Sequence, residues 1–142
     1  MPFTGNFTCN TFKVGILDGT FDFGTGTSDV YKIALYTNAA SLNQDTTAYT
    51  SEGEVVATGY TPGGEVLQVS QVPTTGTSGS VSYLSFNNVS WNASFTARGA
   101  LIYQDGGPAV CVLDFGNDKT STSTFTVQFP AATNTSAIIR IS

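Results

Sequence analysis

The stretch "FTARGALIYQDGGPAVCVL", residues 95–113, decides the fold. Residues 95–104 alternate with a period of two, so the odd positions from Phe95 to Tyr103 fall on one face of an extended strand. Residues 105–107, Asp-Gly-Gly, have the composition of a tight hairpin turn, because glycine readily adopts the positive φ that such turns require. Residues 108–113 are mostly apolar and include two valines, which favour a returning strand. The stretch therefore predicts an antiparallel β-hairpin.

Similar short runs recur along the chain, each bounded by glycine, proline, asparagine or aspartate. They predict further strands near residues 20–23, 30–37, 65–72, 81–86, 125–129 and 137–141. Residues 62–64 and 116–118 predict turns. Pro73 and Pro130 are expected to end the strands that precede them, because proline cannot donate a ladder hydrogen bond.

Two segments lack a clear strand pattern. Residues 11–17 fit either a strand or a helical turn, and residues 37–53 predict a mostly irregular connection, since no 3.6-residue apolar period is sustained there. About eight or nine short strands at a spacing of about ten residues are typical of an antiparallel sandwich or barrel. We expect an all-β antiparallel β-sandwich formed by residues 11–142, preceded by an N-terminal arm of residues 1–10.

The run "DFGTGTSDVYKIALY", residues 22–36, could be a glycine-rich phosphate loop or a simple turn. A phosphate loop must lead directly into a helix, whose N-terminal amides bind the anion. Residues 30–36 are instead β-branched, aromatic and apolar with period-two alternation, which predicts a strand. Residues 24–28 are therefore expected to join two strands as a hairpin.

Charge is scarce in this chain of 142 residues: 11% of the residues are charged and 40% are hydrophobic. Such a composition excludes a disordered chain and leaves a surface suited to packing against other protein. The net charge is −5 and the five cations are scattered, so we expect neither nucleic acid nor a membrane surface as a partner. No apolar run reaches the roughly 20 residues of a membrane-spanning helix.

The inventory of side chains argues against an enzyme. There is no histidine, so the usual triads and general bases cannot be assembled. A glycosidase needs only two carboxylates, but nothing in the sequence shows two of them converging. The "DFG" at residues 114–116 lacks the rest of a kinase, and residues 114–118 do not have the spacing of an EF-hand calcium loop. We expect no catalytic residue, no cofactor and no metal site.

The two cysteines, Cys9 and Cys111, are too few for a metal centre. The N-terminus "MPFTGNFTCN" lacks the basic start and the apolar stretch of a signal peptide, which favours a reducing compartment. We therefore expect two free thiols, with Cys111 buried as a small apolar residue.

Longer strings carry a resemblance. The segment "LDGTFDFGTGTSDVYKIALYTNAASLNQDTTAYTSEGEVVATGYTPGGEVL", residues 17–67, resembles a family of small structural proteins of tailed bacteriophages. The later strings "NNVSW…FTARGALIYQDG" and "VLDFGNDKTSTSTFTVQFP" are similar to the same family. The resemblance extends over nearly the whole chain apart from the first ten residues, and its motifs are structural ones.

The resemblance implies a jelly-roll-like β-sandwich and a role as a capsid decoration or cement protein. Such a protein binds the outer surface of an icosahedral phage head and clamps neighbouring subunits of the major capsid protein. The family supplies no catalytic or cofactor-binding residue. Two alternatives stay open: a tail or baseplate component, and a carbohydrate-binding module for host attachment, for which Trp91 is the best candidate side chain.

Aromatic residues outside the strand pattern are the predicted partner-binding residues: Phe3, Phe7, Phe12, Tyr49 and Tyr60. The rings of the arm, in particular, have no core of their own in which to be buried, so we expect them to reach a neighbouring subunit. A homodimer at two-fold or quasi-two-fold positions of the shell is the expected assembly, because a closed two-fold pair needs only one self-complementary patch.

Overall fold

The structure of the protein, a computed structural model, describes residues 3–76 and 80–141. It has ten strands and one helix. In chain order these are β1 (Phe7–Thr8), α1 (Asn10–Asp18), β2 (Tyr31–Tyr36), β3 (Glu65–Leu67), β4 (Val69–Thr75), β5 (Ser82–Phe86), β6 (Val89–Trp91), β7 (Thr96–Gln104), β8 (Ala109–Thr120), β9 (Phe125–Val127) and β10 (Ile139–Ile141).

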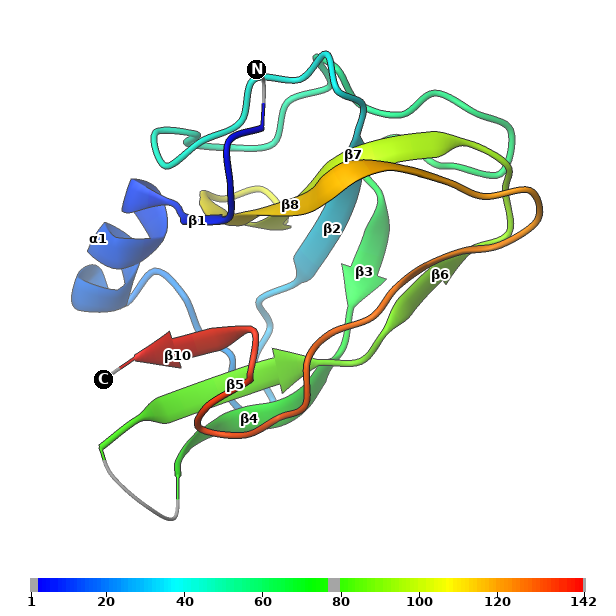
Figure 1. Cartoon of the computed structure of the whole chain (residues 1–142). Helices are drawn as coiled ribbons and strands as arrows, with labels where there is room; N and C mark the ends of the chain where they lie inside the picture. Colours follow the sequence, from blue (N-terminus) through cyan, green and yellow to red (C-terminus); the bar gives the residue numbers. More distant parts are fainter. Residues whose placement is uncertain (1–2, 77–79, 142) are drawn as a thin grey trace.

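The strands form antiparallel sheets that pack as a sandwich (Figure 1). The larger sheet has the strand order β1-β8-β7-β2-β3, the second has the order β10-β5-β4, and β6 pairs with β9. The predicted all-β antiparallel sandwich is confirmed. The strands number ten instead of about eight or nine, because the structure also contains strands of only two or three residues.

The predicted hairpin of residues 95–113 is confirmed and forms the centre of the larger sheet. The expectation that the odd positions from Phe95 to Tyr103 share one face is wrong: Ala97 packs in the core between the sheets, whereas Leu101 and Tyr103 pack in the core on the outer face, on the other side of a register shift between Ala97 and Gly99. Strands β7 and β8 pair from Thr96↔Thr120 to Tyr103↔Ala109, and Gly106 has the positive φ of the turn between them (75°). Unlike a one-sided strand, β7 is buried on both faces. One face packs on the smaller sheets, and the other is covered by the N-terminal segment and the connection that follows β2.

The expected strand at residues 20–23, and with it the hairpin at residues 24–28, is wrong. Residues 20–23 make no ladder, and they hold their place through side chains instead. Phe23 stacks on Tyr31 with ring centroids 4.2 Å apart, and Phe21 packs against Phe12 at 5.0 Å. The phenylalanines that gave this segment a strand-like alternation therefore pack in an aromatic cluster with Phe12 of α1. Residues 24–28 turn the chain, and strand β2 follows as predicted.

Two predicted boundaries are also wrong. The turn expected at residues 116–118 lies inside β8, where a register shift opposite Arg98 accommodates the extra residues and Gly116 has a φ of 87°. Pro73 does not end its strand but lies within β4, at another register shift. β4 is an edge strand, and a bulge on an edge is where a sheet tolerates proline.

Of the two readings of residues 11–17, the helical one holds. The helix α1 ends at Gly19, whose left-handed φ of 80° lets its N–H donate to the Gly15 carbonyl oxygen. Gly15 is itself required, because a Cβ there would lie 2.2 Å from the Phe21 ring. No helix in the described part of the chain is long and apolar enough to cross a membrane. The irregular connection predicted at residues 37–53 is confirmed.

The described part of the expected arm packs against the sandwich. Phe3 is 1% exposed, and Asn6 accepts a hydrogen bond from the Asp114 N–H through Oδ1 (2.6 Å). Residues 7–8 pair with β8 as strand β1. The premise that the rings of this segment have no core in which to be buried is therefore wrong.

Candidate binding cleft

A hollow with a volume of about 700 Å³ separates α1 from β10. Helix α1 and strand β10 lie on the same side of the molecule (Figure 1); α1 lies beside the larger sheet, and β10 is the edge strand of the β10-β5-β4 sheet. A smaller hollow of about 160 Å³ shares Phe12, Ile16, Ile139 and Ile141 with the larger one, so the same apolar residues are reached from two sides. We call this region the α1–β10 cleft.

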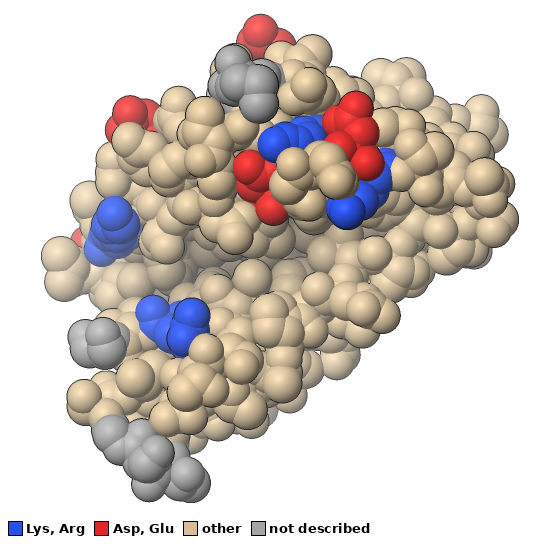
Figure 2. Space-filling model, in the orientation of Figure 1, with Lys and Arg blue, Asp and Glu red and all other residues tan. Residues whose placement is uncertain are grey.

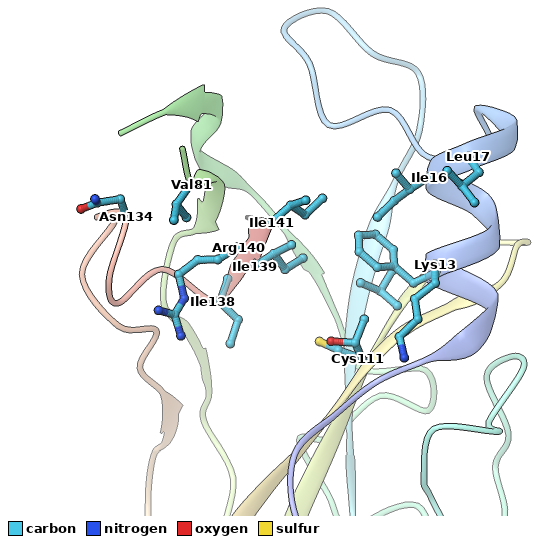
Figure 3. A pocket seen from close by; sticks show the side chains of 13 residues that line it. Lys13, Ile16, Leu17, Val81, Cys111, Asn134, Ile138, Ile139, Arg140 and Ile141 are labelled. Atoms are coloured by element: carbon cyan, nitrogen blue, oxygen red, sulfur yellow. The ribbon is translucent and has the colours of Figure 1, made fainter. Parts of the chain in front are cut away.

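The walls of the α1–β10 cleft are mainly apolar. Figure 3 shows Ile139 and Ile141 projecting from β10 toward α1, where Ile16 and Leu17 stand on the opposite wall. Leu17 is 89% exposed, Ile141 49% and Ile16 42%. Single exposed apolar residues are ordinary, but three that gather around one hollow make the α1–β10 cleft the candidate binding site of this structure.

The floor of the cleft is built by the edge of the larger sheet. Thr8 of β1 and Val110 and Cys111 of β8 line it, and β1 covers β8 for only two residues. Strand β10 forms the wall that faces α1 across the cleft. It pairs with β5 on one side, and among the described residues no strand pairs with its other edge. The two sheets are therefore splayed apart at this end of the sandwich.

The charged side chains that line the cleft are both cations. These are Lys13 of α1 and Arg140 of β10, two of the five cations in the chain. The Arg140 guanidinium donates from Nη1 to the Thr135 carbonyl oxygen (2.6 Å), which holds that side chain beside the cleft. None of the acids, all of which lie in the described part of the chain, lines it. The nearest in sequence, Asp18, accepts hydrogen bonds from Thr20 instead.

Away from the cleft, Figure 2 shows acidic and basic side chains gathered together on the same face of the molecule. Two ion pairs are formed in the described structure. Lys32 lies 3.9 Å from Asp105, and the largely buried Arg98 lies 3.2 Å from Asp114. Arg98 also approaches the Phe3 ring to 5.8 Å, so this pair fastens the N-terminal segment to the sheet.

The predicted partner-binding residues are mostly interior. Phe3, Phe12 and Tyr60 are buried, and Phe7 and Tyr49 are half-buried against the core that covers the outer face of the larger sheet. Phe12 alone of the five lines the α1–β10 cleft. A buried ring reaches a partner only if the segment that carries it is displaced.

Tyr49 and Tyr60 have a structural task around the buried side chain of Glu54. Tyr49 donates its hydroxyl proton to Glu54 Oε1 (2.6 Å), Tyr60 donates to Oε2 (2.7 Å), and the Gly63 N–H also donates to Oε2 (2.8 Å). The Tyr60 hydroxyl oxygen in turn accepts from the Leu35 N–H (2.8 Å). Burial, together with these contacts to the carboxylate, raises the pKa of Tyr49 to about 12. The carboxylate thus fixes residues 49–63 to strand β2.

The two cysteines are free thiols in the structure, and both are buried, as predicted for Cys111. Cys9 belongs to the core on the outer face of the larger sheet, while Cys111 belongs to the core between the sheets. Their side chains point to opposite faces, and a disulfide cannot form across a sheet without moving the backbone. Burial raises the pKa of Cys9 to about 11 and that of Cys111 further, so neither is a reactive thiolate.

The described residues contain no group of three or more His, Cys, Asp or Glu side chains placed to hold a metal ion. Trp91, on which the carbohydrate-binding alternative mainly depended, is 2% exposed and stacks near Tyr60 in the core. A sugar needs an exposed ring on which to stack, so this side chain does not provide one.

No family model, no curated protein and no solved structure matches the chain. The resemblance to phage decoration proteins therefore stays a prediction from the sequence.

Sequence reasoning missed the residues that form the cleft: Ile16, Leu17 and Ile141. A signal for the first two was present. Read as a helix, residues 10–18 place apolar side chains on more than one face, whereas a helix that only covers a sheet needs a single apolar stripe.

Proposed function

We propose that this chain is a structural protein of a tailed-bacteriophage particle, which attaches to the outer surface of the head and clamps neighbouring subunits of the major capsid protein. In this proposal the chain is not an enzyme and uses no cofactor. The inference that the chain belongs to a phage particle and attaches to its shell rests on the sequence resemblance. The mode of attachment is drawn from the α1–β10 cleft.

The observation that carries the proposal is the exposed apolar lining of the cleft. Leu17 is largely exposed to solvent and Ile141 is about half exposed, whereas two large clusters of apolar side chains are buried, one on each face of the larger sheet. Burying a leucine side chain contributes about 1.5–3 kcal/mol. A rigid sandwich that offers such residues at a fixed place loses little conformational entropy on docking.

Many copies, each making a modest contact, would stabilise a shell in parallel, because engagement at one point raises the effective concentration at the next. The proposed partner is the major capsid protein. Association of the chain with itself as a homodimer on the two-fold positions is part of the same proposal, and sedimentation of the purified chain tests it. A trimer would contradict the dimer without affecting attachment.

The test is the number of copies per purified particle, measured by quantitative mass spectrometry of particles from the phage that encodes the chain. A shell protein is present in hundreds of copies, whereas a tail or baseplate component is present in a few dozen at most. Leu17→Glu should lower the occupancy of the shell about tenfold or more. Val56→Glu is the matched control, because Val56 is 96% exposed and lies outside the cleft.

Absence of the chain from particles, or a copy number of a few dozen, would contradict the decoration proposal. Equal occupancy for Leu17→Glu and Val56→Glu would show that the chain attaches through another surface.

A further inference from the structure

The wall of the α1–β10 cleft formed by β10 has an unpaired backbone edge. Its residues pair with β5 in the register Ile139↔Leu84 to Ile141↔Ser82, and on its other side lies the cleft. An unpaired strand edge presents N–H and C=O groups that a strand of another chain can continue. The structure therefore offers a place for an added strand where its two sheets are splayed.

The side chains around that edge fit an extended segment. Figure 3 shows Ile139 and Ile141 directed into the cleft, with Ile16 on the facing wall of α1. Successive side chains of a strand point to opposite faces, so every second side chain of an added strand would enter the cleft. A volume of about 700 Å³ is within the range of sites that enclose a bound group.

The charges of the cleft select the sequence of that segment. Lys13 stands on the α1 wall, and Arg140 lines the cleft from β10 with its side chain directed away from α1 (Figure 3), while the ten acids of the chain lie elsewhere in the described structure. A chain with a net charge of −5 thus presents a locally positive site to its partner. Carboxylates beside the apolar side chains of the segment would meet these cations, which raises the rate of association and fixes register.

We infer that the α1–β10 cleft binds an extended segment of a partner protein, which adds as a strand to the edge of β10, places alternate apolar side chains into the cleft and carries acidic residues beside them. This inference rests on the proposed function, since it names the kind of capsid-protein segment that the decoration protein holds. A second copy of the chain is disfavoured at this edge. A two-fold pair through β10 would bring Arg140 of one copy near Arg140 of the other, and like charges facing each other across strands are destabilising.

The test is a selection of random twelve-residue peptides displayed on a library against the immobilised, purified chain. The expected result is enrichment of peptides in which apolar residues alternate with polar ones and aspartate or glutamate is over-represented. With such a peptide bound, hydrogen exchange of the β10 amides should slow. Ile141→Asp should weaken binding about tenfold or more.

The matched pair for charge is Lys13→Glu and Lys119→Glu. Both lysines are exposed and both changes alter the net charge equally, but Lys119 lies outside the cleft. Lys13→Glu should weaken the binding of the selected acidic peptides about 3–5-fold, whereas Lys119→Glu should leave their binding unchanged. Enrichment of no peptide, of peptides with helical spacing, or of basic peptides would overturn the inference. Equal binding by the Ile141→Asp variant would do so as well.

The selection uses no particles, so its outcome is separate from that of the proposed function. If acidic alternating peptides are selected and the chain is absent from particles, the cleft inference stands and the decoration proposal fails. If the chain decorates shells but the selection gives one of the contrary results, the decoration proposal stands and the strand-addition inference fails.

Discussion

Tyr60→Phe removes one oxygen atom from the centre of the network around Glu54. In the folded chain that hydroxyl accepts from the Leu35 N–H at 2.8 Å and donates to Glu54 Oε2 at 2.7 Å. A hydrogen bond to a charged group contributes about 1.5–3 kcal/mol, and a buried donor without a partner costs about 1–3 kcal/mol. The substitution keeps the ring and therefore the packing against Trp91 and Phe95.

The expected loss in the free energy of unfolding is about 3–5 kcal/mol, which for a domain of this size corresponds to a melting temperature lower by about 10–17 °C. Tyr49→Phe is the matched comparison. It also removes a hydrogen bond to Glu54, but Tyr49 is only half-buried, and the Gly63 N–H beside its hydroxyl keeps Glu54 Oε2 as an acceptor at 2.8 Å. Water can replace the lost donor there, so the expected loss is about 1 kcal/mol.

The assay is urea denaturation followed by far-ultraviolet circular dichroism, with the free energy extrapolated to water for the wild type and both variants. The reasoning is refuted if Tyr60→Phe costs less than about 1 kcal/mol, or if both variants lose the same amount. Either result would mean that Glu54 and the Leu35 N–H find other partners and that the network does not fix the connection to β2.

Three further predictions concern the core. Burial raises the pKa of Cys9 from about 9 to about 11. The stability that its neutral thiol contributes is therefore complete below about pH 9 and is lost as the pH rises through 11. A urea midpoint that is equal at pH 8 and pH 11 would contradict this. Gly64→Ala should lower the free energy of unfolding by about 3 kcal/mol or more, because φ is +80° and the new Cβ would lie 1.8 Å from the Ile33 carbonyl oxygen. Gly106→Ala, at a φ of +75° but in open space, should lower it by about 1 kcal/mol. Equal urea midpoints for the two variants would count against the placement of Gly64. Phe3→Ser should lower the stability of the sandwich by about 3–5 kcal/mol, and unchanged thermal unfolding would show that the N-terminal segment is not packed as described.

The sequence predicted the strands where the local pattern and the tertiary role agree. The hairpin of β7 and β8 could be predicted because its period-two pattern, the valines of its second strand and its Asp-Gly-Gly turn point to the same structure, whereas the burial of β7 on both faces could not be predicted from an alternating pattern. Residues 20–23 could not be predicted correctly, since alternating phenylalanines suit a strand and a ring cluster equally well, and only the neighbouring helix decides between them.

The errors at residues 116–118 and at Pro73 have a common cause. Glycine and proline mark places where the backbone departs from a regular ladder, but a bulge within a strand and a turn between strands use the same residues. The α1–β10 cleft was beyond the reach of the local pattern, because its walls come from opposite ends of the chain. Whether Leu17 or Ile141 is exposed depends on how far apart the fold holds those walls.

The most direct test of attachment through the α1–β10 cleft is an electron cryomicroscopy map of the particle of the phage whose genome encodes this chain. We predict density for the sandwich on the outer surface of the head, with a strand of the major capsid protein lying between α1 and β10 and in contact with Ile141 and Lys13. A map that places the chain in the tail, or on the head with the cleft facing solvent and no partner density within it, would contradict this prediction.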